Sequence, residues 1–324
     1  MKGKQWLSVL MVLLLCLVFT ACKPMTDKTP DKPSDGDSAQ ASDISPLLYE
    51  VTDPDTGNKI WLFGSIHIGT EDFYPLPDYV MEAFETADSL AVEVDIVAFE
   101  KDLVGQMKAL STLVYTDGTT IRDHISAETY DKAVEILEEN HLYNSAYDSY
   151  LPVFWQSLIA NLMYEDTDAD PKLGIDRHMI QAAYDREKEV LSIESAAEQY
   201  QVMAGLSEEL QALLLEDALR QYAMPTVQKM SINMLLAAWK TGNADMLEQL
   251  LNETEGSEIS ADLYAEYMDE MITQRNFNMT DYAEEKLLSG EEVFICVGAA
   301  HVVGSDAMAD LLAEAGYTVE VKQE

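Results

Sequence analysis

Two copies of the tetrapeptide Gly-x-x-His, one near each end of the chain, constrain the fold more than any other feature of the sequence. The first runs from Gly64 to His67 and the second from Gly298 to His301, and each follows a short apolar run. Runs rich in branched and aromatic side chains are typical of strands buried on both faces of a parallel sheet. A glycine permits a sharp turn where such a strand ends. We therefore expect both histidines just past the carboxyl ends of core strands, where open α/β sheets bind their ligands.

The segments that follow the two motifs are also alike. Each contains a helical stretch and then a strand, predicted at Leu90–Asp95 in the first copy and at Tyr317–Lys322 in the second. The sequence therefore predicts an α/β (α+β) fold with two β-α-β halves, each carrying one Gly-x-x-His motif. The two halves bracket a large helical insertion at about residues 96–290.

The insertion is predicted to be helical because its apolar residues recur at positions i, i+3, i+4 and i+7. Helix starts are indicated at Ser126 and Ser260, where a serine can cap the first turn, and at Ser207, which is followed by two acidic residues. One segment inside the insertion, Lys188–Glu194, is short and β-like.

The N-terminal segment predicts export and lipid attachment. Residues 1–21 combine two lysines, an apolar run and a small residue before Cys22, which are the parts of a secretory signal peptide. Residues 19–22, Phe-Thr-Ala-Cys, resemble the lipobox of bacterial lipoproteins, in which the signal is removed and the cysteine carries the lipid. The alternative is an uncleaved anchor helix, but the run is shorter than the ~20 residues that cross a bilayer.

The segment after Cys22 predicts a tether. Residues 22–44 are rich in proline, lysine and aspartate and contain no aromatic residue and no aliphatic residue larger than alanine before Ile44, so they bury too little surface to fold alone. Residues 45–324 then form a single domain. We expect this domain to be lipid-anchored at the extracytoplasmic face of a bacterial cell membrane.

The charge and the cysteine content argue against certain partners, against a disulfide and against a cysteine nucleophile. The formal net charge of −39 disfavours nucleic acid and anionic membrane surfaces as partners, and favours cations, metal ions and basic peptides. Cys296 is the only cysteine that follows the predicted lipid site, so no intramolecular disulfide is expected. Its apolar strand neighbours predict a buried thiol rather than a nucleophile.

The paired histidines indicate a metal site. Two imidazoles and a carboxylate suit zinc, manganese or cobalt, with a further position left open for water. His67 and His301 supply the imidazoles if their strands are neighbours. Glu93 is the best carboxylate because it lies near the end of the strand that follows the first motif, and Asp95, on the same face, is the alternative. A single histidine at a strand end is more often structural, but the repeated pattern favours a site.

Other catalytic motifs are absent from the sequence. It contains no His-Glu-x-x-His, Gly-x-Ser-x-Gly, P-loop or Gly-x-Gly-x-x-Gly pattern, which argues against the common zinc-protease, serine-hydrolase and nucleotide-binding classes. The remaining histidines are predicted to be structural or at the surface: His124, His141 and His178.

Taken together, the two motifs and the helical segment between them resemble the TraB/GumN family. This family includes bacterial pheromone-shutdown proteins and is similar to the animal Tiki metalloproteases. The resemblance extends from about Leu47 to Val321 and includes Gly174-Ile-Asp176, the segment at residues 192–199, and Arg275-Asn276. Ser195 departs from the threonine that the family more often has after the glutamate. The resemblance implies an erythromycin esterase/ChaN-like fold and metal-dependent peptide-bond cleavage, with manganese or cobalt as in Tiki.

Carried onto this sequence, the resemblance implies a role for each matching residue. His67 and His301 would be metal ligands, or one a ligand and the other a base, with Glu93 as a ligand. Arg275 would stabilise an oxyanion or, in the alternative, form an ion pair with an acidic residue. The residues implied to orient the ligands are Asn276 and Glu194.

Two hypotheses about function follow. The first is a lipid-anchored metal-dependent hydrolase that cleaves a secreted or surface peptide. The second is a non-catalytic lipoprotein that binds and sequesters a peptide through the same cleft. Metal content and the effect of replacing the histidines distinguish them.

Overall fold

The computed structural model of this chain describes residues 44–164, 167–252 and 259–323. The predicted signal peptide, Cys22 and the tether up to residue 43 lie outside the described residues. Within the described residues, no helix is both long and apolar enough to cross a membrane.

A six-stranded mixed sheet forms one end of the molecule, which confirms the predicted α/β class. The strands lie in the order β4-β3-β5-β2-β1-β6. Strand β1 is antiparallel to both of its neighbours, whereas β2, β5, β3 and β4 pair in parallel. The strand bounds are β1 Leu48–Thr52, β2 Lys59–Ser65, β3 Ser89–Val92, β4 Glu189–Ser192, β5 Val293–Gly298 and β6 Thr318–Lys322.

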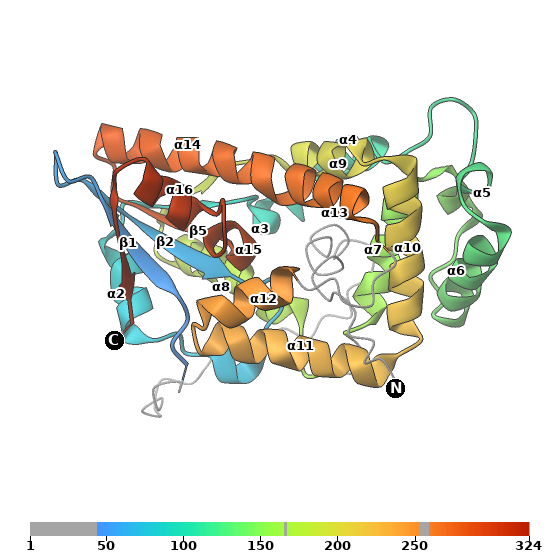
Figure 1. Ribbon diagram of the computed structural model, residues 1–324, viewed down its shortest axis with the longest axis horizontal. Helices are drawn as coiled ribbons and strands as arrows, with labels where there is room; N and C mark the ends of the chain where they lie inside the picture. Colours follow the sequence, from blue (N-terminus) through green and yellow to red (C-terminus); the bar gives the residue numbers. More distant parts are fainter. Residues whose placement is uncertain (1–43, 165–166, 253–258, 324) are drawn as a thin grey trace.

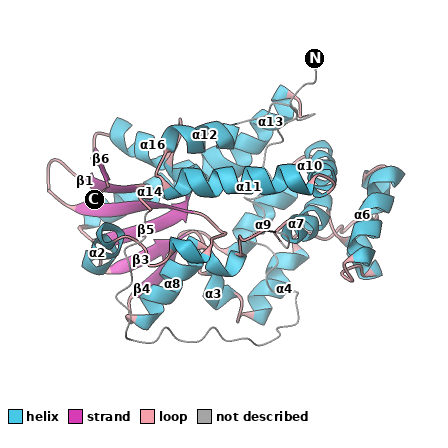
Figure 2. Cartoon of the chain, turned by 90° about the horizontal axis from the view of Figure 1, so that it is seen from below, coloured by secondary structure: helices cyan, strands magenta, loops and turns pink. Residues whose placement is uncertain are grey.

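Helices cover the sheet and form the other end of the molecule. Figure 2 shows α2 and α8 on one side of the sheet and α12 and α16 on the other, while Figures 1 and 2 both place α6 far from the sheet. The longer helices are α2 Asp78–Thr86, α4 Leu103–Ser111, α6 Ala127–Glu139, α7 Pro152–Leu162, α8 Ile175–Asp185, α9 Ala196–Gly205, α10 Glu208–Tyr222, α11 Pro225–Lys240, α12 Ala244–Asn252, α13 Ala261–Met268, α14 Gln274–Ser289 and α16 Met308–Glu314. The short ones are α3 Ile96–Phe99, α5 Ile121–His124, α15 Ala299–Val302, the 3₁₀ turns Glu71–Phe73, Ser145–Ser149 and Pro171–Leu173, and the π-helical turn Asp269–Thr273.

The core strands are buried as their composition predicts. Every residue of β3 and β5 is buried, as are Ile60–Ser65 of β2. The edge strands β4 and β6 are largely exposed, and their sequences carry more charge, which suits an edge that meets solvent. The sheet therefore has a buried centre, and the two motif histidines follow two of its strands.

The predicted helix starts are confirmed at the atomic level. The hydroxyl of Ser126 accepts a hydrogen bond from Thr129 N, and Ser260 and Ser207 cap α13 and α10 in the same way. The predicted β-like segment is also present, as β4, which pairs with β3 at the edge of the sheet. A serine that accepts from the third residue of a helix satisfies one of its free backbone N–H groups, and this fixes where the helix begins.

Three details of the fold differ from the sequence prediction. Strand β1 was not predicted; it joins β2 through a turn in which Asp53 Oδ1 accepts from Asp55 N and Gly57 adopts a positive φ of 78°. Strand β3 ends at Val92 instead of Asp95, because the Asp95 carboxylate accepts from Ala98 N and begins α3. The strands of the two predicted halves also alternate within one sheet, since β5 of the second half lies between β2 and β3 of the first.

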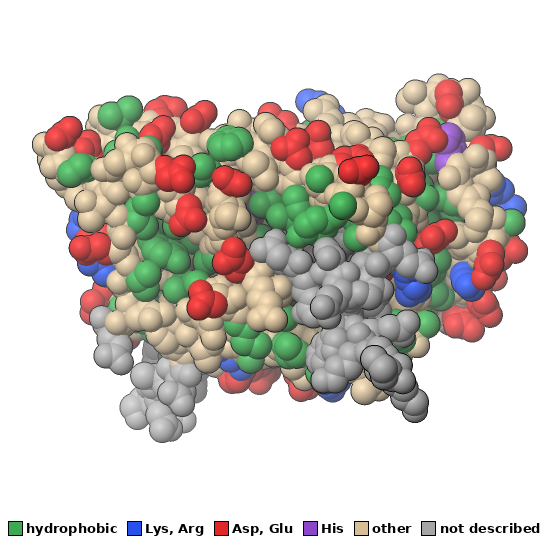
Figure 3. Space-filling view, in the orientation of Figure 1, with side chains coloured by type: hydrophobic (Ala, Val, Ile, Leu, Met, Phe, Trp, Pro, Cys, Tyr) green, Lys and Arg blue, Asp and Glu red, His purple; other side chains and the backbone are tan. Residues whose placement is uncertain are grey.

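The surface reflects the strong negative charge of the chain. Asp and Glu side chains are spread over the face in Figure 3, with few Lys or Arg side chains among them. Cys296, in contrast, is 1% exposed in the middle of β5. Burial is the main reason that the pKa of its thiol is raised well above the usual range. The predicted buried thiol is therefore present, and the thiol is protonated at neutral pH.

Candidate functional site

The two Gly-x-x-His motifs lie side by side at the carboxyl edge of the sheet. Strands β2 and β5 are parallel neighbours in a register that pairs Ser65 with Gly298. Only neighbouring strands allow the two histidines to share a site. The indole of Trp239, on α11, donates to Gly64 O at 2.8 Å and fixes the end of β2.

Three predicted site residues converge at Gly298. A Cβ atom added there would lie 3.1 Å from Glu93 Oε1, 3.7 Å from His301 Cδ2 and 3.8 Å from His67 Nε2. Glycine therefore leaves a small space that the three side chains surround. The structure thus brings together the two imidazoles and the carboxylate that the sequence indicated as metal ligands.

His67 is oriented by an acidic residue from α8. Its Nδ1 lies 3.0 Å from Asp176 Oδ1, so Nδ1 carries a proton and donates it to the carboxylate. The start of α8 is held against the motif because Ile175 N donates to Ile66 O, and because a Cβ on Gly174 would lie 2.6 Å from His67 O. Only glycine permits that approach. The hydrogen bond leaves His67 Nε2 to face the space beside Gly298.

His301 is oriented in the same way by an amide. Its Nδ1 lies 2.7 Å from Asn276 Oδ1, while Asn276 Nδ2 donates to Asp306 O at 2.8 Å. Because the amide nitrogen already has an acceptor, the amide oxygen must accept from His301. The imidazole Nε2 is buried, has no hydrogen-bond partner, and lies 3.9 Å from Glu93 Oε1.

The Glu93 carboxylate is held by several donors. Gly298 N donates to Oε1 at 2.7 Å, and Arg275 Nη2 donates to Oε2 at 2.6 Å. Gln199 Nε2, on α9, also reaches Oε2 at 3.2 Å. Glu93 is 5% exposed and Arg275 6%, so this is a buried ion pair.

Arg275, near the start of α14, joins two carboxylates. Its Nε and Nη2 also donate to Glu194, at 2.9–3.1 Å, and its Nη1 donates to Met271 O at 3.0 Å. Glu194 follows β4, and its backbone N–H donates to Glu93 O. The guanidinium thus links the ends of two neighbouring strands. Arg275 forms ion pairs with acidic residues in this structure, which was the alternative role considered for it.

The surroundings of the two histidines shift their pKa values in opposite directions. Burial alone would lower the pKa of His67, but the charge and hydrogen bond of Asp176 raise it to about 9. Burial, with the Arg275 charge, lowers the pKa of His301 to about 3. Burial would raise the pKa of Glu93, yet Arg275 and the histidines hold it well below its usual range. At neutral pH the cluster therefore contains an anionic glutamate and a neutral His301.

The donor atoms are compatible with a divalent metal ion. Both imidazoles use Nδ1 for a protein hydrogen bond, which is how metal-binding histidines are usually oriented. A carboxylate oxygen has two lone pairs, and the Gly298 N–H uses only one of those on Glu93 Oε1. As the side chains stand, however, no group of three or more His, Cys, Asp or Glu residues in the described part of the chain is arranged as a metal site.

Other residues considered in the sequence analysis lie outside this cluster. Asp95 caps α3 through Oδ1, and its Oδ2 accepts from Tyr184, so neither oxygen contacts the histidines. The ring of His178 lies 4.2 Å from that of Tyr74, and burial lowers its pKa to about 4. His141 adopts a positive φ of 58° just after α6.

Two residues of the cluster received no role from the sequence. Asp176 and Gln199 both belong to segments that carried the family resemblance, but nothing local to them indicates which side chains they contact. Their partners are 109 and 106 residues away in the sequence. Side-chain hydrogen bonds at such separations depend on the tertiary fold.

Comparison with known proteins identifies the family. The family model described as "TraB/PrgY/gumN family" matches residues 47–321, and the chain belongs to this family. It is similar to Uncharacterized protein YbaP of Escherichia coli (strain K12), with 24% identity over 270 residues that cover 79% of this chain and 89% of that protein. Uncharacterized protein YbaP of Shigella flexneri is 24% identical over 264 residues, which cover 78% and 86% of the two chains. No solved structure matches the chain.

The His67–Asp176 pair predicts a pH dependence of stability in metal-free protein. Because the folded state raises the pKa of His67 from 6.5 to about 9, it binds this proton more tightly than the unfolded chain does. The stabilisation is complete below about pH 6.5 and is lost as the pH rises through 9, by up to about 3 kcal/mol. Urea unfolding in the presence of a chelator measures this slope. We expect Asp176→Asn to flatten it between pH 6.5 and 9, and an unchanged slope would contradict the assignment.

Proposed function

We propose that this chain is a metal-dependent hydrolase that cleaves peptide bonds and is lipid-anchored at the extracytoplasmic face of a bacterial membrane. The observation that carries the proposal is that the imidazoles of His67 and His301 converge beside Glu93, and that His301 Nε2 is buried without a hydrogen-bond partner. A buried polar atom of this kind is unfavourable unless an ion, a water molecule or a substrate group binds it. The resemblance to Tiki metalloproteases supports peptides as substrates and an erythromycin esterase/ChaN-like fold.

Each residue of the cluster has a role in this proposal. His67, Glu93 and His301 would hold the metal ion, which would be manganese, cobalt or zinc. When bound, the ion would polarise the scissile carbonyl and lower the pKa of a water molecule. Asn276 orients His301, and Arg275 keeps Glu93 ionised.

Arg275 has a second part in the proposal. Its Nη1 donates one hydrogen to Met271 O, which leaves a second Nη1 hydrogen for an oxyanion that forms during peptide hydrolysis. Glu194 accepts hydrogen bonds from Nε and Nη2 of the same guanidinium at 2.9–3.1 Å. Its role is to position Arg275, and it does not contact the substrate in this mechanism.

Metal analysis tests the proposal directly. We expect wild-type protein, purified without chelator and supplied with Mn²⁺, Co²⁺ or Zn²⁺, to retain a stoichiometric ion in elemental analysis after gel filtration. The retained ion should support cleavage of a peptide library, and chelation should stop it. Protein that holds no ion under any of these conditions would contradict the proposal.

The sequestering lipoprotein is the second candidate, and one observation favours it. Both oxygens of Glu93 already accept hydrogen bonds from protein donors, so the cluster is stable as an ion-pair network. In this case the site would bind peptide without cleaving it. Peptide binding that persists in metal-free protein and in the His67→Ala and His301→Ala variants would support this candidate over the hydrolase.

The lipid anchor is tested separately. Cys22 ends a signal of lipobox form, so wild-type protein should incorporate labelled fatty acid in a bacterial host. The Cys22→Ser variant should not. Label that persists in the variant would place the lipid elsewhere.

A further inference from the structure

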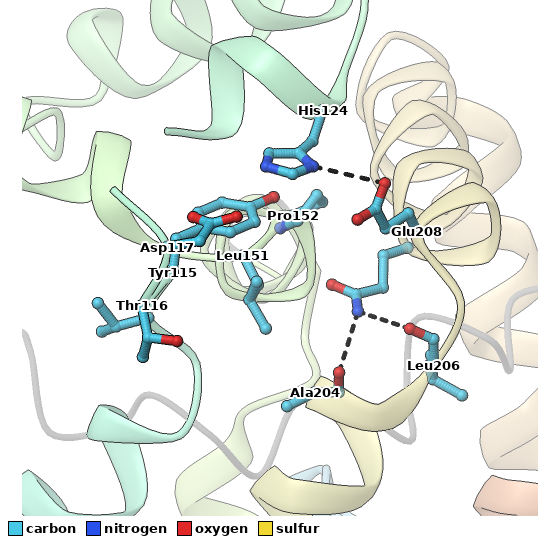
Figure 4. A pocket seen from close by; sticks show the side chains of 11 residues that line it. Tyr115, Thr116, Asp117, His124, Leu151, Pro152, Ala204, Leu206 and Glu208 are labelled. Atoms are coloured by element: carbon cyan, nitrogen blue, oxygen red, sulfur yellow. Dashed lines mark hydrogen bonds and ion pairs between the residues drawn. The ribbon is translucent and has the colours of Figure 1, made fainter. Parts of the chain in front are cut away.

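A pocket separate from the histidine cluster lies in the helical part of the molecule. The residues that line it are far in sequence from both histidine motifs. It has a volume of about 270 Å³ and lies between the segment around Tyr115, the ends of α5 and α9, and the starts of α7 and α10. In Figure 4 a dashed line joins His124 to Glu208, and His124 Nδ1 lies 3.5 Å from Glu208 Oε2. Tyr115, Leu151 and Pro152 also line the pocket. None of the residues used so far in the proposed function lines this pocket.

Gln211 provides a buried acceptor in the pocket wall. Its Nε2 donates to Leu206 O at 2.7 Å and to Ala204 O at 3.3 Å, and both of those residues also line the pocket. These two carbonyls fix the orientation of the amide, because the opposite orientation would bring three oxygens together. Gln211 is 3% exposed, and its Oε1 has no hydrogen-bond partner. A ligand that fills the pocket and carries an N–H or O–H group would satisfy this oxygen.

The charges around the pocket favour a cation. Asp117 and Glu208 contribute carboxylates to the lining, whereas none of the described residues that line it is a lysine or arginine. The rings of Tyr115 and His124 are stacked, with centroids 4.2 Å apart and planes inclined by 9°. Burial and then the charges of Glu208, Asp117 and Asp123 raise the pKa of Tyr115, which reflects the negative potential there. An aromatic face beside carboxylates is a common surrounding for an ammonium group.

We propose that this pocket binds a primary ammonium group, which donates a hydrogen bond to Gln211 Oε1 and lies near the Tyr115 ring and the carboxylates of Asp117 and Glu208. The acceptor selects for an N–H donor, the ring and carboxylates select for positive charge, and Leu151 contacts the carbon chain. The ligand is a free amine or the side chain of a lysine in a peptide.

Helix α9 connects this pocket to the histidine cluster. Gln199, in its first turns, contacts Glu93, and Ala204, near its end, lines the pocket. They are five positions apart, which corresponds to about 7.5 Å along a helix axis, or two to three residues of an extended peptide. If the chain cleaves peptides, as proposed above, the pocket would select a lysine close to the bond that is cut.

Binding measurements test the ammonium site without relying on turnover. The probes are butylammonium chloride, the blocked peptide acetyl-Ala-Lys-Ala-amide, and its neutral norleucine counterpart, titrated by calorimetry into the full-length protein in detergent at pH 8. We expect the lysine peptide to bind at least about tenfold more tightly than the norleucine peptide, and its affinity to fall as salt increases. A lysine peptide that binds more tightly than butylammonium identifies a peptide side chain as the ligand, and equal affinities identify a free amine.

A matched pair of variants locates the binding. Glu208→Gln removes a carboxylate that lines the pocket, and Glu209→Gln removes one from the same exposed helical turn that does not line it. We expect the first to weaken lysine-peptide binding by up to about fivefold and the second to leave it unchanged. Gln211→Met, which removes the acceptor, should weaken it by about tenfold. Equal effects of the two glutamate variants, or equal binding of the lysine and norleucine peptides, would overturn the proposal. Either result leaves the proposed hydrolase untouched.

Discussion

Replacing His67 or His301 by alanine is expected to empty the proposed metal site and to lower the proposed peptide hydrolysis by more than about 100-fold. Replacing a residue that only orients a metal ligand typically lowers metal affinity or activity by about 10–100-fold, so replacing a ligand itself should lower them more. His67 Nε2 and the His301 ring face the same space beside Gly298, and neither side chain can replace the other there. Elemental analysis and a peptide-cleavage assay on each variant measure the two losses.

The double variant and a third histidine provide the controls. If the imidazoles act together on one ion, His67→Ala with His301→Ala should be no less active than either single variant. His141→Asn should behave as wild type, because His141 lies outside the cluster and asparagine tolerates its positive φ of 58°. Full metal content and turnover in either single variant would contradict the site as proposed.

Replacing Arg275 by methionine is expected to destabilise the domain by about 3–5 kcal/mol, because it leaves two carboxylates without their cation in a buried environment. The side chains of Arg275, Glu93 and Glu194 are 7%, 6% and 12% exposed, so solvent cannot replace the lost ion pairs. Chemical denaturation at neutral pH in the presence of a chelator measures the free energy of unfolding. A loss below about 1 kcal/mol would show that the buried ion pair is not a main source of stability.

An exposed ion pair gives the matched control for this effect. Arg186 pairs with Glu85, and their side chains are 40% and 52% exposed. Arg186→Met should therefore change stability by no more than about 1 kcal/mol. Adding Glu93→Gln to Arg275→Met should recover part of the loss, because the amide removes one of the two unpaired charges. An equal loss of unfolding free energy in the Arg275 and Arg186 variants would contradict the idea that burial makes the loss of an ion pair destabilising.

The structure also separates the two carboxylates that the sequence could not distinguish. Glu93 and Asp95 follow the same strand two residues apart, and an extended strand would direct both to one face. The strand instead ends at Val92, and the Asp95 side chain caps α3. The helix start competes with the strand for this residue, because an aspartate satisfies free N–H groups in the first turn. Glu93 therefore stays in the cluster and Asp95 leaves it.

What the sequence by itself determined was the character of most local segments. The apolar composition of β2 and β5 predicted two core strands with a histidine beyond each, and serine caps predicted helix starts. Gly298 ends β5 as predicted, whereas Gly64 lies inside β2, which ends at Ser65. These properties depend on neighbours in the chain, so a local pattern is enough to predict them. Strand β1 was not predicted, because it depends on pairing with β2 and β6, which supply its backbone hydrogen bonds.

Only the tertiary structure decided which side chains meet. Placing β5 between β2 and β3 brings Glu93 to both histidines. The pairing of His67 with Asp176 and of Glu93 with Arg275 joins residues 109 and 182 positions apart. Such contacts are specific because burial makes an unpaired charge costly, and burial is a property of the packed domain that no local pattern contains.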